Sequence, residues 1–316
     1  MNNRSYIYPL KLSCYPKETI WGGDRLSKRY GKCDLTDLGE SWELTVRKKE
    51  QNIIQNGECK GMSLNEYIDR FTSLSSETFP ILIKFIDAHD DLSVQVHPND
   101  EVARHNGERN GKSEMWYVIE ADKGASIIYG TTDGETDFSV KAAIKKRRTS
   151  DVLKRINVAV GDTYFIPGGL VHAIGKGIVL AEIQQNSDTT YRLYDYDRKD
   201  KNGNQRELHI AQATQSLILF SEKDINDIRY SKPCPLEGNV LASCEFFSVT
   251  KLSISGIKKL YTDTSPFISL LCIEGEGKIK WESQEEAMLS GDSFFIPPEL
   301  SSFELEGQLT VIMTTI

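Results

Sequence analysis

Four polar side chains among the first 172 residues have the types and placement expected of metal ligands. They are an amide, two imidazoles and a carboxylate: Gln95, His97, Glu114 and His172. Imidazole nitrogens and side-chain oxygens together form a plausible ligand set for a divalent metal ion such as zinc. Their joint spacing argues against four unrelated polar side chains. The sequence therefore predicts a metal site assembled from distant segments.

A predicted strand over residues 92–97 positions two of these candidates. Its residues alternate between apolar and polar, and successive side chains of a strand point to opposite faces. Ser93, Gln95 and His97 therefore share one face, opposite three aliphatic side chains. A face of hydroxyl, amide and imidazole groups borders either solvent or a polar cavity. Glu114 begins another strand-like segment, and His172 follows a strand and a glycine turn.

The rest of the chain predicts a mainly β protein with a few short helices. Residues 80–87 are almost continuously apolar and indicate a buried strand, whereas residues 63–73 have helical spacing after Ser63, a good N-cap. Residues 99–113 are polar and predict a loop, and residues 136–156 have helical character. Short strands with glycine turns fill the remainder, including the end of the chain. Such a pattern is typical of β-sandwiches and β-barrels.

An internal repeat indicates that one β-module has been duplicated. The segment Gly161–Pro167 recurs as Gly291–Pro297, at an offset of 130 and with five of seven positions identical. At the same offset from His172 the second copy has Ser302, and no histidine occurs after His209. The second copy could not build a similar histidine site. We place the boundary near residues 225–238, giving a catalytic, metal-binding domain over 1–230 and a smaller degenerate domain over 231–316.

Composition narrows the class of protein. The chain has 316 residues, 27% of them charged and 39% hydrophobic, which is typical of a soluble globular protein. A net charge of −8 without a long basic run argues against nucleic-acid binding. The six cysteines form no CxxC pair, and the sequence has neither a signal peptide nor an apolar run of membrane-spanning length. We therefore expect a cytoplasmic protein with reduced thiols and no membrane partner.

The first copy also matches the two-part pattern of the cupins, in which Gly161-Asp162, then Pro167, then His172 form the second part. Several motifs resemble more closely the type I (class I) mannose-6-phosphate isomerases, in their short bacterial form. They are Trp21-Gly22-Gly23, Gly39–Trp42, Leu92–Asp100, Lys112–Tyr117 and Glu182–Asp188 with Arg192. The resemblance covers most of residues 6–210 and, more loosely, the carboxy-terminal half. It implies two cupin-type β-barrel (jelly-roll) modules.

This resemblance implies an aldose-ketose isomerase that interconverts mannose 6-phosphate and fructose 6-phosphate through an enediolate. It also implies one zinc ion per subunit, bound by the four candidate ligands, in a monomer or homodimer whose partner is a small sugar phosphate. Three further residues become candidates for catalysis. Glu182 is a general base or a carboxylate that orients a ligand histidine, and Lys112 assists proton transfer or holds a substrate oxygen. Arg192 stabilises the enediolate or contacts phosphate.

Other interpretations of the sequence remain open at this point. Ser93 either reaches the phosphate or only lines the cavity. We interpret Glu40 and Glu43 as surface charges, and the three histidines outside the ligand set as surface or structural: His89, His105 and His209. The rival functions are another metal-dependent cupin enzyme, such as an iron dioxygenase, and a non-catalytic sugar-binding or regulatory cupin.

Overall fold

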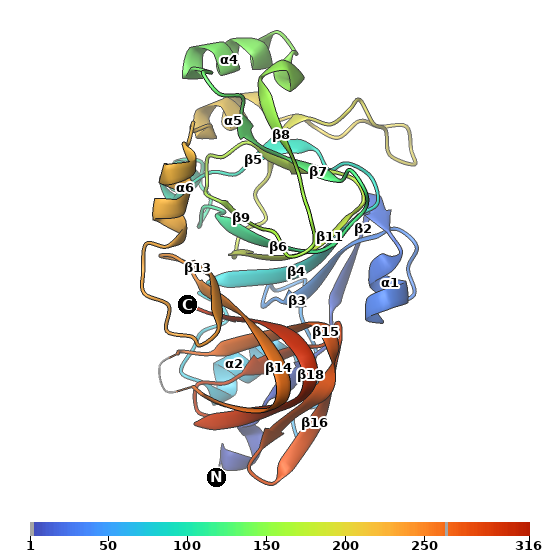
Figure 1. Ribbon diagram of the computed structural model, residues 1–316, viewed down its shortest axis with the longest axis vertical. Coiled ribbons are helices and arrows are strands. Elements are labelled where there is room, and N and C mark those ends of the chain that lie inside the picture. Colours follow the sequence, from blue (N-terminus) through green and yellow to red (C-terminus); the bar gives the residue numbers. More distant parts are fainter. Residues whose placement is uncertain (1–2, 263–264) are drawn as a thin grey trace.

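The computed structural model describes residues 3–262 and 265–316, which form two β-modules stacked along the long axis of the molecule (Figure 1). Every strand pair among these residues is antiparallel. The prediction of a mainly β protein with short helices is confirmed. No helix in the described part of the chain is long and apolar enough to cross a membrane.

Two sheets build the first module and meet around the predicted metal site. The six-stranded sheet has the order β2 (Tyr15–Gly23), β3 (Leu38–Leu44), β4 (Ile81–Ala88), β11 (Ile178–Gln185), β6 (Glu114–Ala121), β9 (Thr163–Ile166). The five-stranded sheet has the order β12 (Tyr191–Tyr194), β5 (Val94–Val96), β10 (His172–Ile174), β7 (Ser126–Thr131), β8 (Leu153–Asn157). Figure 1 shows these two sheets one above the other in the upper module.

The centre of the six-stranded sheet is the most deeply buried part of this module. All eight residues of β4 and all eight of β11 are buried, as the apolar run over residues 80–87 predicts. Burial of this extent removes both strands from water and holds them rigidly. Side chains that project from β4 and β11 into the module are therefore fixed in position.

Short helices lie at the edges of the sheets. They are η1 (Asn3–Tyr6), α1 (Arg25–Tyr30), α2 (Leu64–Phe71), α3 (Asp100–His105), α4 (Asp137–Lys145), η2 (Thr149–Val152), α5 (Ile210–Ser216) and α6 (Glu222–Arg229). The helix predicted over residues 63–73 is confirmed as α2, with the Ser63 side chain accepting a hydrogen bond from the backbone of Glu66.

Two of the local predictions are wrong in part. The predicted loop over residues 99–113 contains α3, which the Asn99 side chain caps, and a capped helix of six residues lacks the repeated apolar spacing used for prediction. The predicted helix over residues 136–156 stops at Lys145. Arg147 adopts a left-handed φ of 56° there, and residues 153–157 pair with β7 as strand β8 instead.

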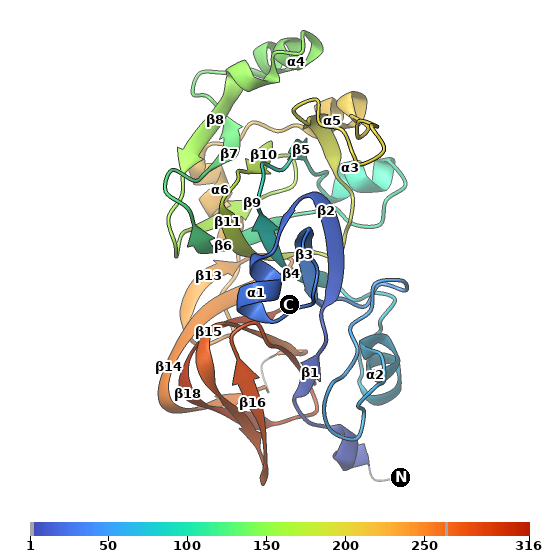
Figure 2. The ribbon, with the colours of Figure 1, turned by 90° about the vertical axis from the view of Figure 1, so that its right-hand side faces the viewer.

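One strongly curved sheet forms the second module (Figure 2). Its order is β1 (Leu10–Leu12), β17 (Ser293–Ile296), β15 (Ile268–Trp281), β18 (Ser302–Thr315), β14 (Ser248–Tyr261), β13 (Asn239–Ser243), and β16 (Gln284–Leu289) pairs with β15. The expectation of short strands here is wrong, because three strands run for 14 residues. Glycines such as Gly256 and Gly275, which resemble turn signals, adopt left-handed conformations within these long strands.

The structure reproduces the internal repeat in detail. Gly161 and Gly291 both have left-handed φ angles, of 91° and 95°, and each precedes a four-residue strand, β9 or β17. Asp162 and Asp292 each accept a hydrogen bond of 2.8 Å from the backbone three residues earlier. The two copies therefore share one local structure, which supports duplication of a β-module. The amino-terminal strand β1 pairs with β17 and so joins the second module.

Candidate metal centre and active site

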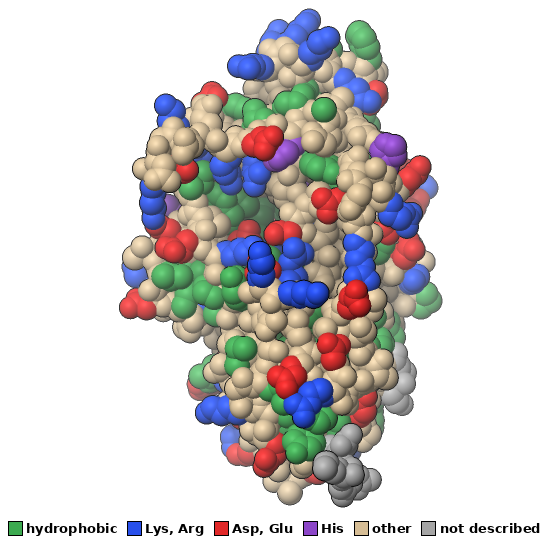
Figure 3. Space-filling model, turned by 180° about the vertical axis from the view of Figure 1, so that it is seen from behind, with side chains coloured by type: hydrophobic (Ala, Val, Ile, Leu, Met, Phe, Trp, Pro, Cys, Tyr) green, Lys and Arg blue, Asp and Glu red, His purple; other side chains and the backbone are tan. Residues whose placement is uncertain are grey.

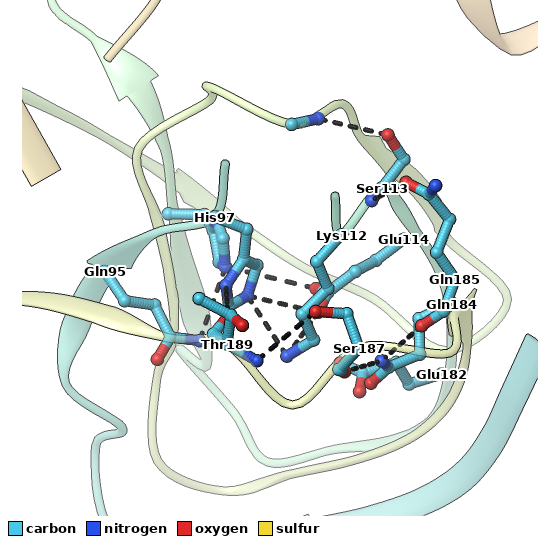
Figure 4. A network of polar contacts seen from close by, with 12 residues as sticks. Gln95, His97, Lys112, Ser113, Glu114, Glu182, Gln184, Gln185, Ser187 and Thr189 are labelled. Atoms are coloured by element: carbon cyan, nitrogen blue, oxygen red, sulfur yellow. Dashed lines mark hydrogen bonds and ion pairs between the residues drawn. The ribbon is translucent and has the colours of Figure 1, made fainter. Parts of the chain in front are cut away.

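Three predicted ligands converge between the two sheets of the first module. Figure 4 shows two of them, His97 and Glu114, with Gln95 and Lys112 nearby. Glu114 begins β6, His172 begins β10, and His97 directly follows β5. Their donor atoms all lie within 4.8 Å of one another, and all three residues are buried. The Nε2 atom of His97 lies 3.1 Å from Glu114 Oε1, and the Nε2 atom of His172 lies 3.9 Å from Glu114 Oε2. Such separations suit donors that each bind one ion at about 2.0–2.2 Å.

Backbone carbonyls orient both histidines toward this point. The Nδ1 atom of His97 lies 2.8 Å from the carbonyl oxygen of Thr189, and that of His172 lies 2.8 Å from the carbonyl oxygen of Leu170. A carbonyl only accepts, so the proton of each ring is on Nδ1 and the Nε2 lone pair is free for a metal.

Burial also keeps both rings neutral. Burial, reinforced by the nearby Lys112 ammonium, lowers the pKa of His97 to about 3, and burial lowers the pKa of His172. A neutral imidazole is the form that binds a metal, so at neutral pH neither ring needs to lose a proton first.

Glu114 supplies a buried anionic oxygen at the same point. Burial opposes its ionisation, but Lys112 and His97 outweigh burial and hold the pKa of Glu114 well below its ordinary value. Its Oε2 atom accepts a hydrogen bond from the Trp116 indole at 3.1 Å. Its Oε1 atom is buried, and no donor among the described residues is directed at it, although Lys112 Nζ lies 3.0 Å away. A buried carboxylate that meets two imidazole lone pairs at one point fits a cation between the three side chains.

The fourth predicted ligand lies beside the cluster. Gln95 is paired directly with His172 across β5 and β10, and its amide Nε2 lies 3.3 Å from His172 Nε2. The two ends of an amide have nearly the same shape, so rotating this group would direct its oxygen at the position that the nitrogen occupies. All four residue types present therefore fit a zinc ion.

A cavity of about 290 Å³ opens beside the ligands and brings the predicted substrate residues together. Ser93, Lys112, Glu182 and Arg192 all line it. Arg192 lies on β12 directly opposite Gln95, and its Nε atom is buried without a hydrogen-bond partner among the described residues. Figure 3 shows a hollow in this module with Lys and Arg side chains gathered at its edge. The cavity thus lies beside the candidate metal ligands, with Gln95 in its lining, and is also lined by basic side chains.

An ion network that the sequence did not predict forms one wall of this cavity. Lys84 is buried on β4, and its Nζ lies 3.1 Å from Glu182 Oε1 and 3.4 Å from Glu40 Oε2. The Trp116 indole bridges this network to the metal cluster, since it also donates to Glu182 Oε2 at 3.0 Å. The sequence did contain one signal that could have revealed this network, namely a single lysine within an apolar run. A lysine on a fully buried strand requires counter-ions, so acidic side chains must lie next to it.

The surroundings of Glu182 bear on its two predicted roles, a general base or a carboxylate that orients a ligand histidine. Among the described residues, neither metal-site histidine is hydrogen-bonded to Glu182, because backbone carbonyls occupy both Nδ1 atoms. Burial, followed by the charge of Glu114, raises the pKa of Glu182 to about 7. Among the described residues, the contacts therefore give no support to a role of Glu182 in orienting a ligand histidine.

The interpretation of Glu40 and Glu43 as surface charges is wrong. Glu40 lines the cavity, and Glu43 is fully buried, where its carboxylate pairs with Lys32 at 2.6 Å. Both lie on β3, which pairs with β2 and β4 within the six-stranded sheet and contacts Ser293 of the second module, and that tertiary position was not visible in the local sequence. His89 and His105 are exposed, as predicted.

Comparison with known proteins identifies the family. Residues 9–130 match the family model described as "Phosphomannose isomerase type I, catalytic domain", and residues 237–316 match "Mannose-6-phosphate isomerase, cupin domain". Together these matches span more than half of the chain.

Two relatives match over nearly the whole chain. The mannose-6-phosphate isomerase ManA of Bacillus subtilis is 39% identical over 303 residues, covering 94% of this chain and 96% of the relative. The mannose-6-phosphate isomerase of Streptococcus mutans is 38% identical over 310 residues, covering 96% and 97%.

The fold agrees with a solved structure of the same family. The crystal structure of the mannose 6-phosphate isomerase from Bacillus subtilis superposes with a TM-score of 0.87 at 34% identity, covering 98% of this chain and 99% of that one. These matches confirm the resemblance expected from the sequence motifs and the cupin fold. The chain belongs to the type I mannose-6-phosphate isomerase family.

Proposed function

We propose that this protein interconverts mannose 6-phosphate and fructose 6-phosphate with the help of one zinc ion per subunit. The observation that supports this most directly is the convergence of the buried Glu114 carboxylate and two neutral histidines, whose donor atoms lie within 4.8 Å of one another, beside a cavity with basic side chains. His97, Glu114, His172 and Gln95 would hold the ion. When bound, zinc polarises substrate oxygens and stabilises developing negative charge without changing its oxidation state.

The chain's own residues would perform the proton transfer. Isomerisation removes a proton from carbon 2 of the aldose, passes through an enediolate and returns a proton to carbon 1. Glu182 is our candidate for this base, since its pKa of about 7 lets it accept and return a proton at neutral pH. Its ion pair with Lys84 fixes one carboxylate oxygen.

Two cations would stabilise the substrate and the intermediate. Lys112, whose Nζ lies 3.0 Å from Glu114 and 3.3 Å from His97 Nε2, is placed to hold a substrate oxygen or assist its proton transfer. Arg192 lies opposite the ligand Gln95 and has an unpartnered Nε, so we assign it to the enediolate. Ser93 is buried on the same face of the strand and lines the cavity.

We further propose that catalysis is confined to residues 1–230 and that residues 231–316 form a degenerate cupin domain without a metal. This division applies equally to a monomer and a homodimer, because the proposed ligands all come from one chain. A phosphorylated substrate and six free cysteines support a cytoplasmic location.

A coupled assay tests the proposal. The metal-free protein would be supplied separately with zinc, manganese and cobalt, and fructose 6-phosphate formation from mannose 6-phosphate would be followed through conversion to glucose 6-phosphate and its oxidation. We expect turnover, and we expect His97→Gln to abolish it. The matched control is His105→Gln, at an exposed histidine eight residues away, which should leave the rate unchanged. No turnover with any of the three metals would refute the proposal.

A further inference from the structure

A second arginine, Arg206, lines the same cavity from the segment that follows β12. Its guanidinium forms a bidentate contact with the carboxylate of Asp195. The Nε atom donates to Asp195 Oδ2 at 2.7 Å, and the NH2 group donates to Asp195 Oδ1 at 2.5 Å. This contact uses two of the five N–H donors of the guanidinium. No other side-chain partner of Arg206 occurs among the described residues, so three donors remain available on a group with a fixed plane.

The carboxylate that holds Arg206 is itself held in place. Asp195 is 5% exposed and begins a turn whose next two residues, Tyr196 and Asp197, have left-handed φ angles of 56° and 52°. Residues other than glycine rarely adopt this conformation, so surrounding contacts must maintain the turn. Arg198 supplies them: its NH2 group donates to Asp195 Oδ1 at 2.6 Å, and its NH1 group donates to the carbonyl oxygen of Asp91 at 2.5 Å.

The charges around the cavity favour a dianion. Five basic side chains line it, Lys17, Lys84, Lys112, Arg192 and Arg206, against three acidic ones, Glu40, Glu182 and Asp188. Lys84 is already paired with Glu40 and Glu182. Arg192 forms no ion pair among the residues that the structure describes, and it lines the same cavity as Arg206. The cavity lining therefore carries more basic than acidic side chains, and this excess of positive charge attracts a doubly charged group such as a phosphate.

The length of the proposed substrate separates the tasks of the two arginines. The reacting carbons 1 and 2 and the phosphate on carbon 6 are at opposite ends of a six-carbon chain. Arg192 is in register with the ligand Gln95 and therefore lies on the metal side of the cavity. Arg206 reaches the cavity from a segment outside both sheets of the module.

We propose that Arg206 binds the phosphoryl group of the substrate and that Asp195 is the positioning residue that sets the plane of its guanidinium. This inference rests on the proposed isomerase function and deepens it. A planar fork with three remaining donors can bind two oxygens of a phosphate at once, which a lysine cannot reproduce. The phosphate carries the same charge in the ground state and in the transition state, so this contact contributes to binding and not to the chemical step.

Steady-state kinetics of Arg206→Gln test the first part. We expect the KM for mannose 6-phosphate to rise about 10- to 100-fold, the usual range for a lost charged hydrogen bond, with kcat changed less than about threefold. Inhibition by inorganic phosphate should weaken by a similar factor. The matched control is Lys201→Gln, which removes the same charge from the exposed tip of the same segment and should leave both constants unchanged. Should Arg206→Gln fail to fold, Arg206→Lys keeps the charge without the fork and should still raise KM.

A double-mutant cycle tests the role of Asp195. Asp195→Asn keeps the shape of the side chain and removes its charge, so KM should rise while kcat is preserved. The double variant Asp195→Asn/Arg206→Gln should bind substrate no more weakly than Arg206→Gln alone, because Asp195 acts through Arg206. Losses in KM that multiply would show that Asp195 is only structural and overturn its assignment.

The outcomes also separate this inference from the proposed function. Absence of turnover by the unaltered protein would reject the isomerase function itself. Normal turnover combined with an unchanged KM and unchanged phosphate inhibition in both Arg206 variants would overturn only the assignment of Arg206. A fall in kcat at constant KM would overturn it as well, since it would place Arg206 beside the reacting carbons.

Discussion

Replacing Lys84 with methionine should destabilise the folded protein strongly, because it leaves two carboxylates without their shared counter-ion. Lys84 Nζ lies 3.1 Å from Glu182 and 3.4 Å from Glu40. At an effective dielectric constant of about 20, each contact has a Coulomb energy of about 5 kcal/mol, most of which offsets the desolvation of the charges. Removing one partner of a buried pair typically costs about 3–5 kcal/mol, and we expect a loss in that range for Lys84→Met.

The free energy of unfolding lost in Lys84→Met should increase as pH rises. Glu182 has a pKa of about 7, raised by burial and Glu114, so the folded protein binds its proton more tightly than the unfolded chain does. The resulting stability is present in full below the ordinary pKa of 4.5 and is lost as pH rises through about 7. Without Lys84 the pKa of Glu182 should rise further. The extra destabilisation should therefore be about 1 kcal/mol larger at pH 8 than at pH 6.

Urea unfolding of the metal-free protein at both pH values, followed by circular dichroism, measures these differences. The matched variant is Lys84→Met/Glu182→Gln, which also removes the carboxylate that shares the buried pair and should recover most of the lost free energy. A small, pH-independent effect of Lys84→Met, or a double variant less stable than the single one, would refute the reasoning.

Three further predictions concern the metal and the cavity. Chelation should abolish activity but preserve the circular dichroism spectrum, because the ligands project from strands that an aliphatic and aromatic core holds together; unfolding on chelation would contradict this. The metal-free protein should lose stability as pH falls from about 6.5 toward 3, by about 1.4 kcal/mol per pH unit from His97 alone. In this pH range His97 is protonated in the unfolded chain but stays neutral in the folded protein. Urea titrations of His97→Gln should show a shallower slope, and equal slopes would exclude this cause. Arg192→Ala should lower kcat and kcat/KM about 100- to 1000-fold in the coupled assay with KM changed less than about tenfold, whereas normal kcat with a large rise in KM would reassign Arg192 to phosphate.

The metal ligands could be predicted because their signals are local. Gln95 and His97 share a strand face through simple alternation, and the Gly161–Pro167 turn fixes the start of the strand that presents His172. The structure brings these segments together as expected, in a protein whose family the motifs had already indicated. Function that is encoded in short, regular stretches is accessible without coordinates.

The missing parts of the site depend on tertiary contacts. Nothing in the sequence around Glu40 distinguishes it from other strand residues. Its contact with Lys84 forms only because β3 pairs with β4 in the folded sheet. Arg206 lies in a segment with no periodic pattern, and only the turn after Asp195 directs it back to the cavity. Neither relationship has a fixed sequence spacing, so a single sequence offers no means of finding it.

The second module shows which residues of the site depend on one another. Strand pairing relates the two copies. Glu114 lies opposite Ile166 in the first module, and Ile268 lies opposite Ile296, the repeat counterpart of Ile166, in the second. Ile268 therefore occupies the position of the ligand carboxylate. By the same registers, Leu270 corresponds to Trp116.

The ion network has been replaced in the same way. In the strand registers of the first module, Glu182 lies opposite Trp116 on one side and Lys84 on the other. In the second module, Met313 lies in the same way between Leu270 and Thr250. In the second module, uncharged side chains thus occupy the positions of the ligand carboxylate, the candidate base and its lysine. Losing any one of these charges alone would leave its partners buried and unpaired, which is more costly than losing all of them. The second module therefore lacks the ligand carboxylate, the candidate base and its lysine together, which avoids leaving any one of these charges buried without its partners.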